Sequence, residues 1–254
     1  MIEVEGLSKS FTTEGGERKV LDNVNFRANT GEFVSVIGPS GCGKSTLLHI
    51  IAGIDEANSG AVKINGDANS PKLGHVGYMQ QKDLLLPWRT VLDNVILGLE
   101  LKGVARSDAR QKALEHIETF GLKGFENQYP FVLSGGMRQR AQFLRSVLLR
   151  QEVMLLDEPF GALDALTRHQ MQEWLLNLWR TLGNTIILVT HDTDEALLLS
   201  DKIYVMSARP AKIVMSLDVD LPRPRTHATV TEPEFAKLKA KLLAQLHERQ
   251  PATI

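Results

Sequence analysis

The feature that most constrains this chain is a short glycine-rich stretch between an apolar run and a segment with helical spacing. The apolar run covers residues 33–37, and the helical segment covers residues 45–52. The stretch and the first helical residue are Gly38, Pro39, Ser40, Gly41, Cys42, Gly43, Lys44 and Ser45. Glycines allow successive backbone N–H groups to face one concavity, and the start of a helix adds positive potential there. The sequence therefore predicts a strand, an anion-binding loop and a helix in succession.

The spacing of this loop is that of G-x-x-x-x-G-K-[ST], a pattern that binds nucleotide phosphates. We expect Lys44 to reach the β- and γ-phosphates and the Ser45 hydroxyl to bind Mg²⁺, with Thr46 beside them as a nucleotide-binding residue. Cys42 is interpreted as a small residue that fits the loop, in preference to a thiol with a lowered pKa at a helix N-terminus. The alternative for the whole motif is a loop that only turns the chain.

Two acidic residues follow a second apolar run, residues 153–156. Asp157 is placed to hold the Mg²⁺ shell, and Glu158 to orient and deprotonate an attacking water. The alternative is a pair of solvated acids at the end of a strand. The phosphate loop in the same chain favours the catalytic interpretation.

Apolar runs alternate with a helical pattern in the core of the chain. Residues 33–37, 153–156 and 185–189 read as buried strands, and residues 167–182 read as a helix between the last two. This alternation predicts an α/β fold with a largely parallel sheet.

The other segments read differently. Residues 1–30 show the period of half-buried strands, with a turn or loop expected over 12–19, and residues 92–149 read as a helical insertion. Two more strands are expected at 59–66 and 74–79.

The composition of the chain limits the classes of function that are open to it. The 254 residues contain 29 Lys and Arg against 30 Asp and Glu, so a globally basic, nucleic-acid-binding surface is disfavoured and no nucleic-acid partner is expected. The single cysteine excludes an intramolecular disulfide. No signal peptide and no apolar run of roughly 18–20 residues is recognised, so a membrane role would be peripheral.

Residues 133–140 form a second glycine turn that opens a helix, and Ser134 lies 23 residues before Asp157. One chain thus carries two anion sites at helix N-termini. This order of motifs resembles the ATP-binding-cassette (ABC) ATPases over residues 1 to about 215. The further positions that carry the resemblance are Phe11, Gln80, Ser134, Gly135, Gly136, Asp164 and His191.

The resemblance implies a P-loop NTPase core with an antiparallel β subdomain and an inserted α-helical subdomain. An ABC ATPase domain would cover residues 1–221, with the helical subdomain at about 92–149. Residues 222–254 would form a C-terminal extension with a short amphipathic helix near 234–248, lying on the domain, on anionic lipid or in solvent.

The resemblance also implies ATP and Mg²⁺ as cofactors. Phe11 would stack on adenine, Gln80 would act at the Mg²⁺ ion and in catalysis, and His191 would contact the γ-phosphate and the attacking water. Asp164 would belong to the nucleotide-binding D-loop. Core packing is the alternative for Phe11, and a structural or solvated role is the alternative for His191.

A head-to-tail dimer is implied as well, with a homodimer expected. Each ATP would lie between the phosphate loop of one subunit and the partner's copies of Ser134, Gly135 and Gly136. The physical reason is that a helical subdomain that points away cannot bring its own helix end to the γ-phosphate.

Residues 84–95 and 207–213 resemble the branch that imports nitrate, sulfonates, taurine and related small solutes, apart from Ala211 and Met79. This implies an ATPase subunit at the cytoplasmic face of the inner membrane, with an integral membrane permease and, indirectly, a solute-binding protein as partners. The apolar run 84–88 is open to two readings, permease contact or core packing. The alternatives are a soluble ABC ATPase that does not act in transport, and an unrelated P-loop kinase or GTPase.

Overall fold

The fold is known from a computed structural model, which describes residues 1–68 and 72–247. Its larger sheet has the strand order β5-β6-β7-β3-β8-β9, in which only the β8–β9 pair is antiparallel. The strands are β3 (Phe33–Ile37), β5 (Gly77–Met79), β6 (Val153–Asp157), β7 (Thr185–Thr190), β8 (Lys202–Met206) and β9 (Ile213–Asp218). The expected α/β fold with a largely parallel sheet is therefore confirmed.

The smaller sheet is antiparallel, with the order β2-β1-β4. Its strands are β1 (Ile2–Thr13), β2 (Gly16–Ala28) and β4 (Ser59–Ile64). The turn or loop expected over 12–19 is present but shorter, because Thr13 pairs with Gly16 and the hairpin turns within two residues. The side chains at this hairpin tip are all exposed, so no apolar alternation marked the two strands there.

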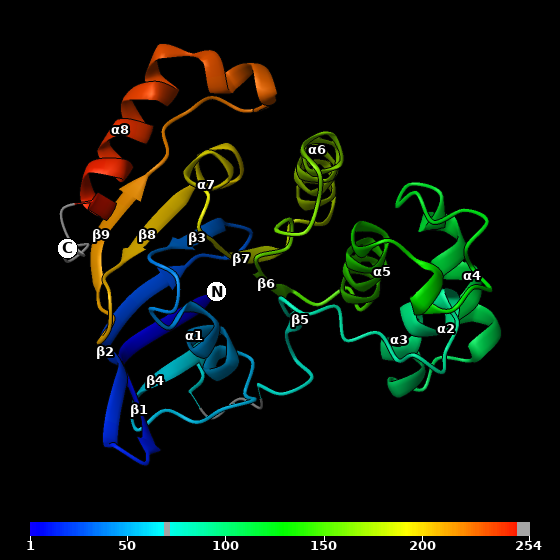
Figure 1. Cartoon of the computed structure of the whole chain (residues 1–254), viewed down its shortest axis with the longest axis horizontal. Helices are drawn as coiled ribbons and strands as arrows, with labels where there is room; N and C mark the ends of the chain where they lie inside the picture. The colour runs from blue at the N-terminus through cyan, green and yellow to red at the C-terminus, as the bar shows by residue number, and fades with distance from the viewer. Residues whose placement is uncertain (69–71, 248–254) are drawn as a thin grey trace.

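Helix α1 (Lys44–Ile51) packs between the two sheets (Figure 1). Leu47 and Leu48 share one buried core with Val4 of β1 and with Val36 of β3. This burial on both sides fixes the start of α1, and therefore the phosphate loop, against the end of β3.

The helical block lies beyond β5, at one end of the molecule (Figure 1). Its helices are α2 (Val91–Val95), α3 (Leu97–Leu101), α4 (Arg106–Ile117), η1 (Pro130–Val132) and α5 (Gly135–Leu148). Buried Asn94 fixes the turn before α2. Its Nδ2 donates to the carbonyl oxygens of Leu86, Arg89 and Thr90 at 3.0 Å, and its Oδ1 accepts from the Leu86 N–H at 2.7 Å.

The remaining helices are α6 (Ala165–Leu182), α7 (Thr193–Leu199), η2 (His227–Thr231) and α8 (Pro233–His247). The sequence had assigned no element to the segments that form α7, β8 and β9. Within residues 1–68 and 72–247, no helix has both the length and the apolar character needed to cross a membrane.

The C-terminal segment packs on the large sheet beside β8 and β9 (Figure 1). Phe235 and Leu242 of α8 are buried in one core with Ile37 and Leu197. Buried Arg225 donates to the carbonyl oxygens of Leu197 and Val219, at 3.1 and 2.8 Å. Of the segment that was expected to form an extension, 248–254 lie outside the described residues.

Candidate functional site

The glycine-rich loop connects β3 to α1 with its backbone turned inward. Gly41 and Gly43 have φ values of 72° and 127°, where side chains other than hydrogen are strained. A Cβ on Gly43 would also lie 2.8 Å from Val20 Cγ1. The buried Lys44 ammonium donates to the carbonyl oxygens of Gly38 and Pro39, at 2.8 and 3.1 Å. These bonds keep the ammonium inside the loop.

Strand order brings the acidic pair to the same edge of the sheet. The ends of β6, β7 and β3 are neighbours, because each strand pairs in parallel with the next. The N–H of Glu158 donates to the carbonyl oxygen of Val189 at 2.9 Å, which continues the β6–β7 pairing by one residue. Glu158 itself has φ 48°, an uncommon conformation for a residue with a side chain, and such residues concentrate at functional sites.

Asp157 is suited to hold a cation. Its side chain is buried with 3% exposure, and its Oδ1 has no hydrogen-bond partner among the described residues. Burial raises the pKa of Asp157, although the nearby Ser45 hydroxyl partly opposes this. Burial, together with Asp157, also raises the pKa of the Tyr78 phenol. A divalent cation would give the orphaned oxygen a partner and favour the ionised carboxylate, so the residues present fit Mg²⁺.

The carboxylate of Glu158 is held from two sides. Gln81 Nε2 donates to Glu158 Oε2 at 3.0 Å, and His191 Nδ1 lies 3.5 Å from Glu158 Oε1. His191 follows β7, and its side chain is exposed. A carboxylate, an amide and an imidazole therefore converge in front of the phosphate loop.

The glutamine at this site is Gln81, whereas the sequence prediction had named Gln80. The backbone carbonyl of Gln80 accepts from Gln142 Nε2 at 2.7 Å, and Gln80 is not among the residues that line the phosphate-loop cavity. Two glutamines follow each other after β5, so no local pattern tells which side chain reaches Glu158.

These residues surround one cavity of about 330 Å³. Its lining consists of Ser40, Gly41, Gly43, Lys44, Ser45, Thr46, Gln81, Glu158, His191 and Arg209. Sequence reasoning missed Arg209 as a site residue. The signal that could have found it is an arginine just beyond a short apolar run, residues 203–206, in a chain whose other apolar runs end at the site.

The second glycine turn does not reach this cavity. Ser134 caps α5, and its Oγ accepts from the Met137 N–H at 3.2 Å. Gly135 and Gly136 open that helix. Asp164 caps α6 in the same way, and its hydrogen bonds with Thr167 lower the pKa of the carboxyl group. None of these four residues lines the cavity of the phosphate loop.

Of two further candidate residues, Phe11 lies outside the phosphate-loop cavity and Cys42 is buried. Phe11 is on β1 with 39% exposure, and the Lys9 ammonium lies 4.8 Å from its ring centroid. Its ring is therefore exposed on the small sheet and outside the phosphate-loop cavity. Cys42 is buried, and burial raises the pKa of its thiol. The alternative of a thiol activated by a lowered pKa is therefore wrong.

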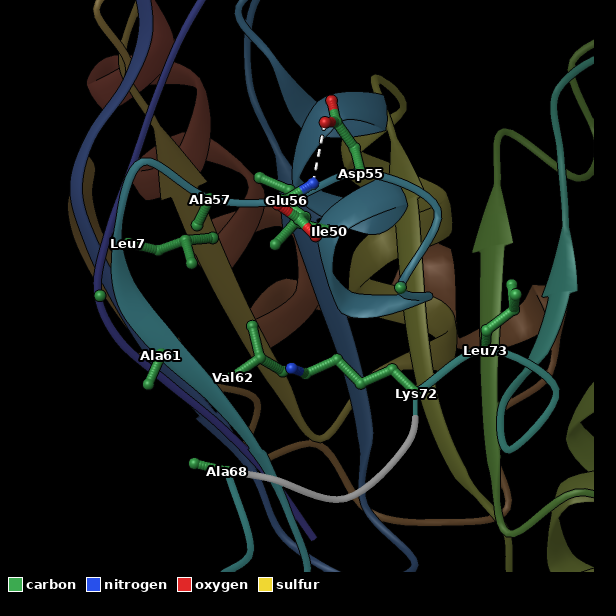
Figure 2. Close-up of a pocket in the computed structure, with 12 residues that line it drawn as sticks. Leu7, Ile50, Asp55, Glu56, Ala57, Ala61, Val62, Ala68, Lys72 and Leu73 are labelled. Atoms are coloured by element: carbon green, nitrogen blue, oxygen red, sulfur yellow. Dashed lines mark hydrogen bonds between the residues drawn. The ribbon is translucent and has the colours of Figure 1, made fainter.

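A separate cavity of about 510 Å³ lies between the small sheet and the end of α1 (Figure 2). Leu7 and Val62 line it on one side, and the Lys72 side chain extends toward Val62. It shares no lining residue with the phosphate-loop cavity. It therefore plays no part in the chemistry described above.

Comparisons with known proteins agree with this geometry. Residues 21–161 match the family described as ABC transporter. The chain is 43% identical to the aliphatic sulfonates import ATP-binding protein SsuB of Bacillus subtilis, over 95% of this chain and 92% of that protein. It is 38% identical to the nitrate import ATP-binding protein NrtD of Synechocystis, over 98% and 96%.

A solved structure is also similar. It is described as a dimeric, post-hydrolysis state of the ATP-binding cassette MJ0796 bound to ADP and Pi. The TM-score is 0.80 at 30% identity, covering 87% of this chain and all of that one. With the phosphate loop and Glu158 lining one cavity, these matches show that the chain belongs to the ABC transporter family and is an ATP-binding cassette that hydrolyses ATP.

Proposed function

We propose that this chain is the ATP-hydrolysing subunit of an importer for a small organic or anionic solute, which enters through a separate permease. The observation that carries the proposal is the position of Glu158, directly after Asp157 and between Gln81 and His191. This arrangement suits in-line attack of a water on the γ-phosphate, in which positioning and charge stabilisation supply most of the catalysis.

Each side chain at the edge has a distinct proposed role. Glu158 accepts the proton of the attacking water, and Gln81 and His191 orient the carboxylate and the water. Gln81 thereby takes the catalytic part of the role first assigned to Gln80. Lys44 leaves its two carbonyl partners for the β- and γ-phosphates when nucleotide enters the loop. Ser45 and Asp157 would hold Mg²⁺, which when bound neutralises phosphate charge.

The reaction centre of one chain is proposed to be completed by a second copy. Ser134, Gly135 and Gly136 form a helix N-terminus that can receive the γ-phosphate, but they do not line the cavity of their own chain. A head-to-tail dimer would bring this helix end to the partner's nucleotide, with Asp164 at the same contact. The similar cassette MJ0796 is described as dimeric. ATP binding would close the dimer, and hydrolysis would reopen it.

A permease partner is supported by the surface that follows Gln81. Leu85 is buried, but Leu84 and Trp88 are exposed, Trp88 by 72%. The turn that carries Trp88 is fixed by Asn94, so an exposed indole is presented on a rigid support. The named relatives import sulfonates and nitrate, which supports a small anionic or organic solute. The chain would then be a peripheral protein at the cytoplasmic face of the membrane and would meet a solute-binding protein only through the permease.

The dimer is tested with Ser134→Ala, using Ser107→Ala on the exposed surface of α4 as the matched control. A non-hydrolysable MgATP analogue should dimerise the wild type and the control, measured by light scattering. Ser134→Ala should stay monomeric and lose roughly 10- to 100-fold in turnover, because charge-assisted contacts to the γ-phosphate are removed. The lost helix cap costs about 1 kcal/mol, so unchanged binding of ADP by the monomer serves as the folding control.

Monomeric wild type that hydrolyses ATP at its full rate would contradict the shared reaction centre. Co-purification then separates the importer from the soluble ABC ATPase. An integral membrane protein should accompany the tagged chain from detergent-solubilised membranes of its own host. Recovery of the chain from the soluble fraction alone would favour the non-transport alternative.

A further inference from the structure

Arg209 lines the phosphate-loop cavity but has no role in the proposed hydrolysis. It lies in the turn between β8 and β9, on the rim of the phosphate-loop cavity that also holds Lys44. Its side chain is exposed and, among the described residues, makes no hydrogen bond or ion pair. An unpaired guanidinium at an anion site offers up to five N–H donors in a planar fork.

The turn that carries Arg209 is fixed to the rest of the domain. The Ala211 N–H donates to the Val20 carbonyl oxygen at 2.9 Å, and the Ala211 carbonyl accepts from the Asp22 N–H at 2.9 Å. Lys212 adds an ion pair with Asp22 at 2.8 Å. The turn is thus anchored through both the N–H and the carbonyl of Ala211, while the Arg209 side chain stays free to reach a ligand.

The same strand that anchors the turn also abuts the phosphate loop. Val20 Cγ1 lies within 2.8 Å of where a Cβ of Gly43 would be, so β2 touches the loop directly. The main-chain oxygen of Met206, the last residue of β8, similarly lies 2.9 Å from the position of a Cβ on Gly38. The phosphate loop and the turn that carries Arg209 therefore both pack against β2 and the end of β8.

Of the cationic side chains that line the cavity, Lys44 already has partners, whereas Arg209 is free to contact an anion. Lys44 is held by two carbonyl groups, and His191 is beside Glu158. Arg209 is close enough for its positive charge to act on the Cys42 thiol inside the loop. A polyphosphate carries several negative charges, more than one ammonium neutralises, and a guanidinium can bind two phosphate oxygens at once.

We propose that Arg209 is a further phosphate-binding residue, whose guanidinium binds oxygens of the nucleotide held by the phosphate loop. This rests on the proposed function only in requiring that the loop binds nucleotide. Arg209 approaches from the β8 side of β3, whereas Glu158 and His191 approach from the β7 side. It therefore serves nucleotide affinity and does not act in the attack of water.

The test compares Arg209→Ala and Arg209→Lys with Arg180→Ala, a control at an exposed arginine in the last turn of α6. Dissociation constants are measured for MgADP, for a non-hydrolysable MgATP analogue and for tripolyphosphate, which has no base or ribose. Arg209→Ala should weaken all three by roughly 5- to 30-fold, the scale of one charge-assisted contact. Arg209→Lys should lose less, and Arg180→Ala should match the wild type.

Three outcomes would overturn the proposal. These are wild-type affinities in Arg209→Ala, an equal loss in Arg180→Ala, or a loss for MgADP without one for tripolyphosphate, which would place the contact at the ribose or base. The affinity of Arg209→Ala should also depend less on salt than that of the wild type. A wild-type chain that bound none of the three probes would instead contradict the proposed function, so the two failures are distinguishable.

Discussion

The edge of the large sheet and the helix end at α5 differ in what the chain supplies to them. At the sheet edge, Glu158 already touches Gln81 and His191, and Asp157 is buried without a partner for one oxygen. At the helix end, Ser134 is satisfied by its own helix. The groups at the sheet edge therefore already contact one another within one chain, whereas the contact made by Ser134 stays within its own helix.

Titratable groups show the same contrast. Glu195 of α7 is buried and lines a small cavity together with His191. Burial raises the pKa of Glu195 to about 7, although Gln172 donates a hydrogen bond to its carboxyl group at 3.0 Å. Asp164 is at a helix end in solvent, and hydrogen bonds lower its pKa. Burial thus raises the pKa of Asp157 and Glu195 and favours their neutral forms, whereas the hydrogen bonds of the helix cap lower the pKa of Asp164 and favour its ionised form.

The largest effect is expected from Glu158→Gln. If the attacking side is complete within one chain, this change should lower ATP turnover by roughly 10²- to 10⁴-fold, because the general base is lost. Binding of ATP should persist, and the closed dimer should accumulate, which light scattering with MgATP detects. Glu115→Gln, at an exposed position on α4, is the control. Near-normal hydrolysis in Glu158→Gln would show that another group takes the proton.

The carboxyl contrast predicts opposite pH dependences. Because folding raises the pKa of Glu195 from 4.5 to about 7, the folded state binds more protons than the unfolded state between these values. Its contribution to stability therefore falls as pH rises through this window. Glu195→Gln should not show this fall. The difference in unfolding free energy between Glu195→Gln and the wild type should therefore rise by on the order of 2 kcal/mol from pH 4.5 to pH 8, as measured by urea unfolding.

Asp164→Asn supplies the opposite sign in the same experiment. The lowered pKa of Asp164 gives stability that is present above its unfolded value of 3.8 and is lost as pH falls. The wild type should therefore exceed Asp164→Asn at neutral pH and lose that advantage in acid. If the unfolding free energies of the two variants changed with pH in the same direction relative to the wild type, the contrast between buried Glu195 and the solvent-exposed cap Asp164 would be refuted.

A smaller effect distinguishes the two neighbouring glutamines. Gln81→Ala removes the amide that orients Glu158 and should lower turnover by about 10-fold, with ATP affinity little changed. Gln80→Ala is the matched control, because the contact seen at Gln80 is made by its backbone carbonyl. Steady-state kinetics of both variants decide the matter. A larger loss in Gln80→Ala would return the role to the residue that the sequence had indicated.

Local patterns predicted the elements that carry the loop and the acidic pair. The runs at 33–37, 153–156 and 185–189 became buried parallel strands. They could be predicted because a strand buried on both faces is continuously apolar, and because the glycine loop needs a strand before it and a helix after it. A turn near Thr13 was expected, but the extension of both strands up to it was missed, because the side chains there are exposed and follow no apolar period.

The phosphate loop, the acidic pair and the α/β class could therefore be predicted from the amino-acid order alone, since each depends on residues that are neighbours in the chain. It took the folded chain to show that Gln81 and Arg209 line the cavity, and that α8 shares a core with Ile37. These features depend on which side chains meet when distant segments pack together. A one-residue shift along the chain turns a side chain toward another neighbour, and no local pattern records that direction.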